Sequence, residues 1–397
     1  MVKSKLSILN DFGYEYRDRI GAGGFAEVLL CWNEAIGFVA VKSLLEKCIN
    51  DETPRKTRTG NRKSSDISKE LFMREYRILN KLDNCSSAPK LKGQKIIMTD
   101  SNGNHLREAN NLDDVKNMFI IMEYVRGPTI EHITNSLYNN SIRLDNEVDN
   151  NLREIGGKNR TFIPLYPAKY IAEFLASGLE EVHNNGIIHQ DLTPPNIMIK
   201  WDESIRYTKI MDFGIAEEEE DKENRGLKID INVGNRFYTS PEQIKGEEIT
   251  YKSDIHQFGQ VLYQLLTNVN PFINQGVVER KSNIIKKLIG HLKEDRGYLT
   301  ESQKNGILAK VKGDALEIRY DNLFDGYYIS PRKINKEIPR ELSNIIEGCL
   351  EVDPNKRYHS MKDVVNDLEK LHVYGRNSEV LTLLNKVYSK FPAKLRK

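Results

Sequence analysis

The chain has 397 residues, of which 39% are hydrophobic and 29% are charged, so we expect a globular protein of two or three domains, or one two-lobed enzyme with insertions. Its 59 Lys and Arg residues nearly balance its 57 Asp and Glu residues, and this balance gives no reason to expect nucleic acid or an anionic membrane as a partner. The four cysteines lie far apart, which argues against a zinc site and against a disulfide framework.

The first residues, Met1-Val2-Lys3-Ser4-Lys5, lead into a polar stretch rather than into the apolar core of a secretion signal. No window of the sequence approaches the roughly 20 consecutive apolar residues that a membrane helix needs. Together with the cysteine pattern, these features predict a cytoplasmic protein.

Three short stretches near the start have the pattern of β-strands. Residues 14–20, 27–32 and 38–42 are rich in apolar, aromatic or β-branched residues, and glycines separate them. Short strands that are punctuated by glycine favour an antiparallel meander.

The segment 47–69 breaks this pattern. It is basic and polar and carries many hydroxyl groups, so we expect a solvated loop or a disordered insert. Apolar residues then recur at helical spacing and predict an amphipathic helix from about 67 to 82. An apolar strand over 118–125 runs into Arg126-Gly127-Pro128, a sequence suited to a junction between lobes.

The second half of the chain is predicted to be mainly helical. Helices are expected from Pro167 onward and near three later ranges: 253–267, 339–350 and 360–372. Two polar or poorly patterned segments, 137–163 and 273–336, are interpreted as insertions, and 373–397 as an extra basic helix.

Six segments indicate a function through their order along the chain, although none of them is specific by itself. They are Gly21-Ala22-Gly23-Gly24-Phe25-Ala26-Glu27-Val28, Val39-Ala40-Val41-Lys42, Glu75 on the predicted helix, Met122-Glu123-Tyr124-Val125, His189-Gln190-Asp191-Leu192-Thr193-Pro194-Pro195-Asn196 and Asp212-Phe213-Gly214. Taken singly, the first four could be a hairpin turn, a strand with a surface lysine, an exposed helix charge and a plain buried strand. The pattern of the first does not suit a dinucleotide-binding fold, because a strand rather than a helix follows the glycines.

Together these segments resemble the motifs of the eukaryotic-like (Hanks-type) protein kinase family. Three further matches support the resemblance: Ser240-Pro241-Glu242, the spacing from Asp254 to Gly259, and Arg357. In kinases the residues that match Glu242 and Arg357 pair in the lower lobe. The resemblance covers about residues 12–372, and Ser240-Pro241-Glu242-Gln243 looks most like bacterial serine/threonine kinases.

The resemblance implies a two-lobed α+β fold. Its parts would be an N-lobe over 12–122 with a five-stranded antiparallel sheet and the Glu75 helix, a hinge at 123–127, a mainly helical C-lobe over 128–372, and a C-terminal helical extension over 373–397. ATP and one or two Mg²⁺ ions would lie between the lobes.

The resemblance also implies roles for individual residues. Asp191 would act as the catalytic base, Lys42 would bind the α- and β-phosphates, and Glu75 would hold Lys42, with Glu70 as a rival partner. Asn196 and Asp212 would bind Mg²⁺. The residues expected to contact the nucleotide or its metal are Ile20, Gly21, Ala22, Gly23, Gly24, Phe25, Val28, Ala40, Lys42, Met122, Glu123, Val125, Asn196 and Asp212. His189 and Phe213 are interpreted as core residues.

Several positions depart from the family pattern. Ala26 replaces a glycine, and Thr193 replaces a lysine that is common in serine/threonine kinases. Gln190 replaces an arginine that usually receives a phosphate from the activation segment, and no Ser, Thr or Tyr occurs over 213–237. We therefore expect activity that does not depend on phosphorylation in that segment. The acidic run Glu217-Glu218-Glu219-Glu220-Asp221 could be a solvated loop tip or a docking patch for basic substrates.

The expected function is transfer of the γ-phosphoryl group of ATP to Ser or Thr of protein substrates, with autophosphorylation on hydroxyls of the 47–69 insert. The alternatives are a small-molecule phosphotransferase of similar fold and a pseudokinase scaffold. The former would typically lack the Pro-Glu element and the Arg357 segment, and the latter would have lost one of Lys42, Asp191, Asn196 and Asp212. The sequence leaves the substrate's identity and the oligomeric state open.

Overall fold

The computed structural model describes residues 4–57, 60–106, 112–137, 162–200, 208–219, 237–272, 326 and 328–389. They belong to two compact units. Unit 1 spans Met1–Gly127, Gly178–Asp191 and Met198–Asp230, and unit 2 spans Pro128–Ser177, Leu192–Ile197 and Ile231–Lys397. Among the described residues no helix is both long enough and apolar enough to cross a membrane.

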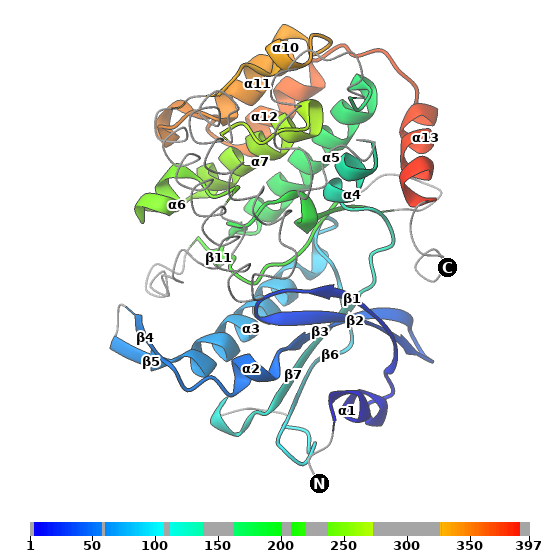
Figure 1. Cartoon of the computed structure of the whole chain (residues 1–397), viewed down its shortest axis with the longest axis vertical. Coiled ribbons are helices and arrows are strands. Elements are labelled where there is room, and N and C mark those ends of the chain that lie inside the picture. Colours follow the sequence, from blue (N-terminus) through cyan, green and yellow to red (C-terminus); the bar gives the residue numbers. More distant parts are fainter. Residues whose placement is uncertain are drawn as a thin grey trace, which may run out of the picture. The chain divides into compact units, whose positions relative to one another are not determined.

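A five-stranded antiparallel sheet forms the centre of unit 1 (Figure 1), which confirms the prediction for this part of the chain. Its strands are β1 (Glu15–Ala22), β2 (Ala26–Asn33), β3 (Gly37–Leu44), β6 (Leu91–Thr99) and β7 (Asn117–Glu123). They lie in the order β1-β2-β3-β7-β6, and every neighbouring pair is antiparallel. Strands β2, β3 and β7 are therefore interior, and their apolar character follows from this position.

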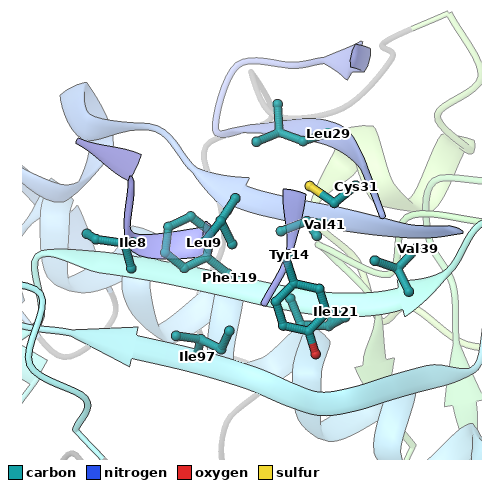
Figure 2. Close-up of a cluster of buried hydrophobic side chains, with 10 residues drawn as sticks. All are labelled: Ile8, Leu9, Tyr14, Leu29, Cys31, Val39, Val41, Ile97, Phe119 and Ile121. Carbon is teal, nitrogen blue, oxygen red and sulfur yellow. The ribbon is translucent and has the colours of Figure 1, made fainter. Parts of the chain in front are cut away.

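One face of this sheet packs against the helix α1 (Lys5–Asp11). Side chains alternate between the two faces of a strand, so Leu29 and Cys31 share a face, as do Val39 and Val41. Figure 2 shows them with Ile8 and Leu9 of α1 in a single buried cluster. Helix α1 was not expected from the sequence pattern. Its signals were the N-cap residue Ser4, which accepts from the N–H of Ser7, and the adjacent apolar pair.

The segment 47–69 is not the irregular loop that its polarity suggested. It contains the end of α2 (Glu46–Ile49), a hairpin of β4 (Pro54–Thr57) and β5 (Gly60–Lys63), and the first turns of α3 (Ser64–Lys81). The carbonyls of Thr53 and Asp51 accept from the N–H groups of Ser64 and Ser65, which satisfies two donors at the start of α3. A polar hairpin lacks an apolar alternation, so the sequence pattern did not reveal it.

The later parts of unit 1 contribute short strands. Strand β8 (Ile187–Ile188) pairs with β11 (Glu217–Glu218), and β9 (Ile197–Ile199), which begins at the last residue of unit 2, pairs with β10 (Thr208–Ile210). Each pair flanks one of the predicted site segments. The first lies next to His189-Gln190-Asp191, and the second lies just before Asp212-Phe213-Gly214.

Unit 2 is helical in its described residues. Its helices are α4 (Ile130–Leu137), the larger part of α5 (Leu165–Asn184), α6 (Pro241–Lys245), α7 (Tyr251–Thr267), α10 (Pro331–Ile334), α11 (Arg340–Cys349), α12 (Met361–Glu369) and α13 (Asn377–Tyr388). The helices expected near 253–267, 339–350 and 360–372 are confirmed as α7, α11 and α12. The predicted insertions, 137–163 and 273–336, lie largely outside the described residues, since the structure does not describe 138–161 and 273–325.

Helix α7 is buried along almost its whole length and forms the core of unit 2. A Cβ on Gly259 would lie 2.7 Å from Cβ of Cys349 on α11, so glycine allows the two helices to approach closely. Helix α13 contacts α4, and its buried residues are Val380, Leu383, Leu384 and Val387. The predicted C-terminal extension therefore contains a helix that belongs to the body of unit 2.

Candidate active site

The register of the sheet places four predicted nucleotide contacts on one face. Val28 lies opposite Lys42 on β3, and Ala40 lies opposite Met122 on β7. Residues that face each other across an antiparallel pair point to the same side of the sheet. Val28, Ala40, Lys42 and Met122 therefore share the face opposite α1. Strand pairing alone brings these residues together, although Val28 and Met122 are 94 positions apart in the chain.

Lys42 is the centre of a charged cluster in unit 1. Its Nζ donates to both carboxylate oxygens of Glu75 at 2.6 Å and to Oδ1 of Asp212 at 2.7 Å. The Lys42 side chain is 12% exposed and that of Glu75 is 4% exposed, whereas that of Asp212 is 50% exposed. The cluster is therefore closed on the Glu75 side and open on the Asp212 side.

Glu70, the rival partner for Lys42, pairs elsewhere. Its carboxylate accepts from Arg62 at 2.8 Å, and both side chains are about one-third exposed. Glu70 and Glu75 are five residues apart on α3 and so point in different directions. The structure brings Glu75, and not Glu70, to Lys42.

The three charges shift one another's pKa values. Burial disfavours the ammonium of Lys42, but attraction by Asp212 and Glu75 outweighs it and raises the pKa of Lys42. Attraction by Lys42 lowers the pKa of Asp212, although partial desolvation opposes it. For Glu75, burial is the largest cause and raises the pKa, although Lys42 opposes it. Of the two carboxylates, Asp212 at the exposed edge of the cluster is thus the one whose charged form is favoured.

The turn at Asp212-Phe213-Gly214 aims the Asp212 carboxylate at Lys42. Asp212 has φ of 62°, in the left-handed region that residues other than glycine seldom adopt. Phe213 is fully buried, and its ring meets that of His189 edge to face at 4.9 Å. His189 is fully buried as well, and its Nε2 lies 3.0 Å from the carbonyl of Met211. Both aromatic side chains therefore anchor the turn from inside the core.

Asp191 is half-buried at the end of a segment of unit 1. Its backbone N–H donates to Nδ1 of His189 at 3.2 Å, so the same buried imidazole supports both Asp191 and the turn of Asp212. Gln190, which precedes Asp191, has φ of 66°. Left-handed conformations at non-glycine residues often occur at functional sites, where the surrounding structure maintains them.

Asn196 lies in unit 2, at the end of the 3₁₀ turn Pro194–Asn196. Its N–H donates to the carbonyl of Thr193 at 2.9 Å. Thr193, where many serine/threonine kinases have a lysine, is 2% exposed. Its side chain is thus part of the packing of unit 2.

The glycine cluster forms the turn between β1 and β2. Gly21 and Ala22 still pair with β2, and the N–H of Gly23 donates to the carbonyl of Ala26 at 2.8 Å. A Cβ built on Gly24 would meet no protein atom within 4 Å. The cluster is therefore a hairpin whose tip faces open space, a geometry that suits close approach of phosphate oxygens.

The segment Met122–Val125 leaves the sheet at the end of β7. The carboxylate of Glu123 pairs with Lys209 at 2.9 Å and with Lys200 at 3.2 Å. The backbone N–H of Val125 has no hydrogen-bond partner among the residues that the structure describes, although its side chain is 3% exposed. A backbone N–H of this kind can donate a hydrogen bond to a ligand.

Two residues of the acidic run have partners that the sequence analysis missed. Glu218 pairs with Lys81 at 2.7 Å, and Glu217 lies 3.6 Å from Arg74. Both basic residues are on α3, so the solvated loop tip is the wrong description for Glu217 and Glu218, which form β11. The signal was present in the spacing of Arg74 and Lys81, since positions seven apart lie on one face of a helix.

Within unit 2, Arg357 and Glu242 form the ion pair that the family resemblance implies. Two bonds of 2.7 and 2.8 Å join the guanidinium to the carboxylate, and the side chains are 0% and 3% exposed. Arg357 also donates to the carbonyls of Glu351, Lys252 and Val352. The pair thus fixes α6 to the start of α7 and to the segment before α12.

Asp212 offers a carboxylate oxygen that the described part of the protein does not use. Both hydrogen bonds that Asp212 accepts within the described chain, from Lys42 and Gly214, go to Oδ1. Oδ2 of this half-exposed carboxylate is therefore left for a hard cation. Carboxylate and amide oxygens, the groups that Asp212 and Asn196 carry, are both ligands that Mg²⁺ accepts, so the chemistry of each residue taken by itself fits a magnesium ion.

Comparisons with known proteins agree with this geometry. A family model described as Protein kinase domain matches residues 14–368. The chain is 28% identical over 259 residues to the Clostridium perfringens protein named Probable serine/threonine-protein kinase CPE1738, a match that covers 65% of this chain and 28% of that protein. It is 26% identical over 257 residues to Serine/threonine-protein kinase PknB of Mycolicibacterium smegmatis, covering 64% and 30%.

A third relative is Serine/threonine-protein kinase PknB of Mycobacterium tuberculosis, which is 32% identical over 163 residues, or 40% of this chain and 21% of that protein. In all three matches the chain spans less than a third of the relative's own length.

Proposed function

Since the chain belongs to the protein kinase family, whose model matches residues 14–368, we propose that it transfers the γ-phosphoryl group of ATP to Ser or Thr hydroxyls of protein substrates. The observation that carries the proposal is the cluster of Lys42, Glu75 and Asp212. Protein kinases need a strand lysine held by a helix glutamate, together with an aspartate that binds Mg²⁺. The Ser/Thr class is supported by the names of the three relatives.

In this proposal ATP binds to the face of the sheet that carries Val28, Ala40, Lys42 and Met122. The apolar side chains would contact the base, the N–H of Val125 would donate to its edge, and Lys42 would bind phosphate oxygens. The glycine hairpin would cover the phosphates, with Ile20, Ala22 and Phe25 beside it. Glu75 would hold Lys42 extended, because its carboxylate contacts the ammonium through both oxygens.

Mg²⁺, when bound by Asp212 and Asn196, would neutralise negative charge on the phosphate oxygens. The chain's own residues would do the rest. Asp191 would accept the hydrogen bond of the attacking hydroxyl, orient it in line with the γ-phosphorus, and take up its proton. The imidazole of His189 supports the backbone of this aspartate, so it would act as a positioning residue rather than as an acid or base.

The proposal is tested by incubating the purified chain with radiolabelled ATP, Mg²⁺ and a generic protein acceptor. The wild type should label the acceptor, and phosphoamino acid analysis should find phosphoserine or phosphothreonine. Asp191→Ala and Lys42→Ala should label it at background level while keeping the wild-type circular dichroism spectrum. Labelling that survives in Asp191→Ala would contradict the assigned base. Transfer to small alcohols or amines but not to protein would favour the small-molecule phosphotransferase.

Activity should not require phosphorylation between residues 213 and 237. Fixed charges could replace a phosphate there, since Glu217 and Glu218 already pair with Arg74 and Lys81 of the helix that carries Glu75. Since the segment contains no Ser, Thr or Tyr, the test addresses the ion pairs instead. The charge reversal Lys81→Glu should lower activity, and Lys81→Glu combined with Glu218→Lys should restore part of it. Wild-type activity in Lys81→Glu would refute the idea.

Autophosphorylation is proposed for a smaller set of hydroxyls than the sequence suggested. Ser64 and Ser65 are 6% and 3% exposed, which makes them poor acceptors, whereas Thr53 is exposed. Thr57 and Thr59 stay candidates on the basis of sequence alone. After incubation with Mg²⁺ and ATP, phosphate should be found on Thr53, Thr57 or Thr59 in the wild type and be absent in Asp191→Ala. The cytoplasmic location also stays a prediction, which cell fractionation would test.

A further inference from the structure

Helix α7 carries three glutamines on one face of its otherwise largely apolar sequence. Gln257, Gln260 and Gln264 are spaced by three and four residues, so their side chains project to the same side. Gln257 is 1% exposed and Gln260 is 0% exposed. A primary amide is costly to bury unless its donors and acceptor are hydrogen-bonded. The partners of these side chains therefore indicate what the glutamines do.

Gln257 binds the backbone of the segment that follows the proposed catalytic base. Its Oε1 accepts from the N–H of Leu192 at 2.8 Å. Leu192 is fully buried, and it is the residue next to Asp191 in the chain. Gln257 and Leu192 both belong to unit 2, so this hydrogen bond lies within that unit.

Gln243 determines which way the amide of Gln257 points. Oε1 of Gln243 accepts from the N–H and the hydroxyl of Ser240 at 2.9 and 3.0 Å, as part of the capping box of α6. The same oxygen accepts from Nε2 of Gln257 at 3.0 Å. Because only the NH₂ group of Gln257 can donate to it, Oε1 of Gln257 must turn toward Leu192.

Gln260 has a similar environment but different partners. Its Nε2 donates to the carbonyl of Tyr238 at 2.8 Å and lies 3.0 Å from Nδ1 of His256. The hydroxyl of Tyr238 in turn donates to Oε1 of Gln264. Gln260 thus stabilises the segment before α6 through Tyr238, whereas Gln257 binds Leu192, which makes Gln260 a control on the same face of α7.

We propose that Gln257 is a positioning residue for phosphoryl transfer: by holding the N–H of Leu192, in an orientation set by Gln243 and Ser240, it fixes the backbone that carries Asp191. This inference rests on the proposed function, in which Asp191 is the base. The side-chain amide of Gln257 is neutral, so its hold on the backbone of Leu192 does not depend on phosphorylation of the protein. Nucleotide binding is not affected directly, because the proposed contacts of ATP in unit 1 do not include Gln257.

The test compares Gln257→Met with Gln260→Met in the full chain. Both substitutions keep a buried, unbranched side chain of similar length and remove hydrogen bonds, so both should lower the melting temperature by a similar amount. In Gln257→Met, kcat should fall about 10- to 100-fold, as expected when a catalytic group is slightly misplaced, while Kd for ATP stays within roughly twofold of the wild type. In Gln260→Met, kcat at saturating acceptor should fall by less than about threefold.

Hydrogen exchange of the peptide that contains Leu192 provides a readout that does not need activity. Exchange there should become faster in Gln257→Met and stay unchanged in Gln260→Met. Faster exchange with a wild-type kcat would overturn the positioning role, as would equal losses of kcat in the two variants. If the wild type itself transferred no phosphate while exchange still responded to Gln257→Met, the proposed function would be wrong, and the hydrogen bond would have only a structural role.

Discussion

The ammonium of Lys42 lies 2.6 Å from both carboxylate oxygens of Glu75, which is 33 positions away in the chain. Glu75 is buried, and burial raises the pKa of its carboxyl, a shift that the attraction by Lys42 opposes. Lys42 has a second carboxylate partner in Asp212. The relationship is therefore mutual, since each side chain favours the charged form of the other and helps to fix its position.

Replacement of Glu75 should impair catalysis, whereas the same replacement at Glu70 should not. Glu75→Gln keeps the shape of the side chain but removes the charge that holds Lys42 extended. We expect kcat/KM for ATP to fall about 100-fold, the cost of a displacement of roughly 1 Å at the reacting groups. Glu70→Gln removes only a partly exposed ion pair with Arg62 and should leave kinetics within about twofold. Steady-state kinetics of both variants distinguish the two, and equal effects would contradict the assignment.

Loss of Arg357 should destabilise the protein strongly. Arg357→Met leaves the buried carboxylate of Glu242 without its cation, although Ser253 still donates to it at 2.6 Å. Removal of one partner of a buried pair typically costs about 3–5 kcal/mol, and urea unfolding should detect this. The double variant Glu242→Leu with Arg357→Met removes both charges and should recover a large part of the loss. A double variant less stable than Arg357→Met would show that the charges are not coupled.

Acid should weaken the same pair. Burial alone would raise the pKa of Glu242, but Arg357 outweighs it, so the pKa of this carboxyl is lower in the folded protein than its ordinary value of 4.5. The stability that the pair contributes is thus fully present above pH 4.5 and is lost as the pH falls through the lowered pKa. Melting temperatures of wild type and Glu242→Gln should differ most near neutral pH and converge in acid. A constant difference across this range would refute the linkage.

Two glycine substitutions should separate nucleotide binding from folding. A Cβ on Gly24 meets no protein atom, so Gly24→Ala should keep the wild-type melting temperature within about 2 °C but raise KM for ATP if phosphates approach this backbone. A Cβ on Gly214 would lie 3.1 Å from Oδ1 of Asp212, so Gly214→Ala should displace that carboxylate and lower kcat. Unchanged KM for ATP in Gly24→Ala would argue against the phosphate-covering role of the hairpin.

Some parts of the site were predictable because they depend on local pattern. Alternation and glycine spacing indicated the strands around Lys42, and helical spacing indicated the helix with Glu75. The segment 47–69 was predicted wrongly, since the hairpin and the start of α3 are stabilised by backbone pairing that leaves no apolar period in the sequence. The helix α1 was missed because its apolar face is only one turn long.

The sequence by itself determined which chemical groups the protein has and in what order: a lysine on a strand, two aspartates and an asparagine on later loops, and glycines where backbone must be accessible. Only the tertiary structure decided which charges meet. Lys42 reaches Glu75 and Asp212, Glu70 pairs with Arg62, and Glu217 and Glu218 pair with basic residues of α3. The physical reason is that ion pairs and buried amide contacts depend on distances of a few ångströms between residues far apart in the chain. Strand register and helix packing set those distances, and local sequence does not encode them.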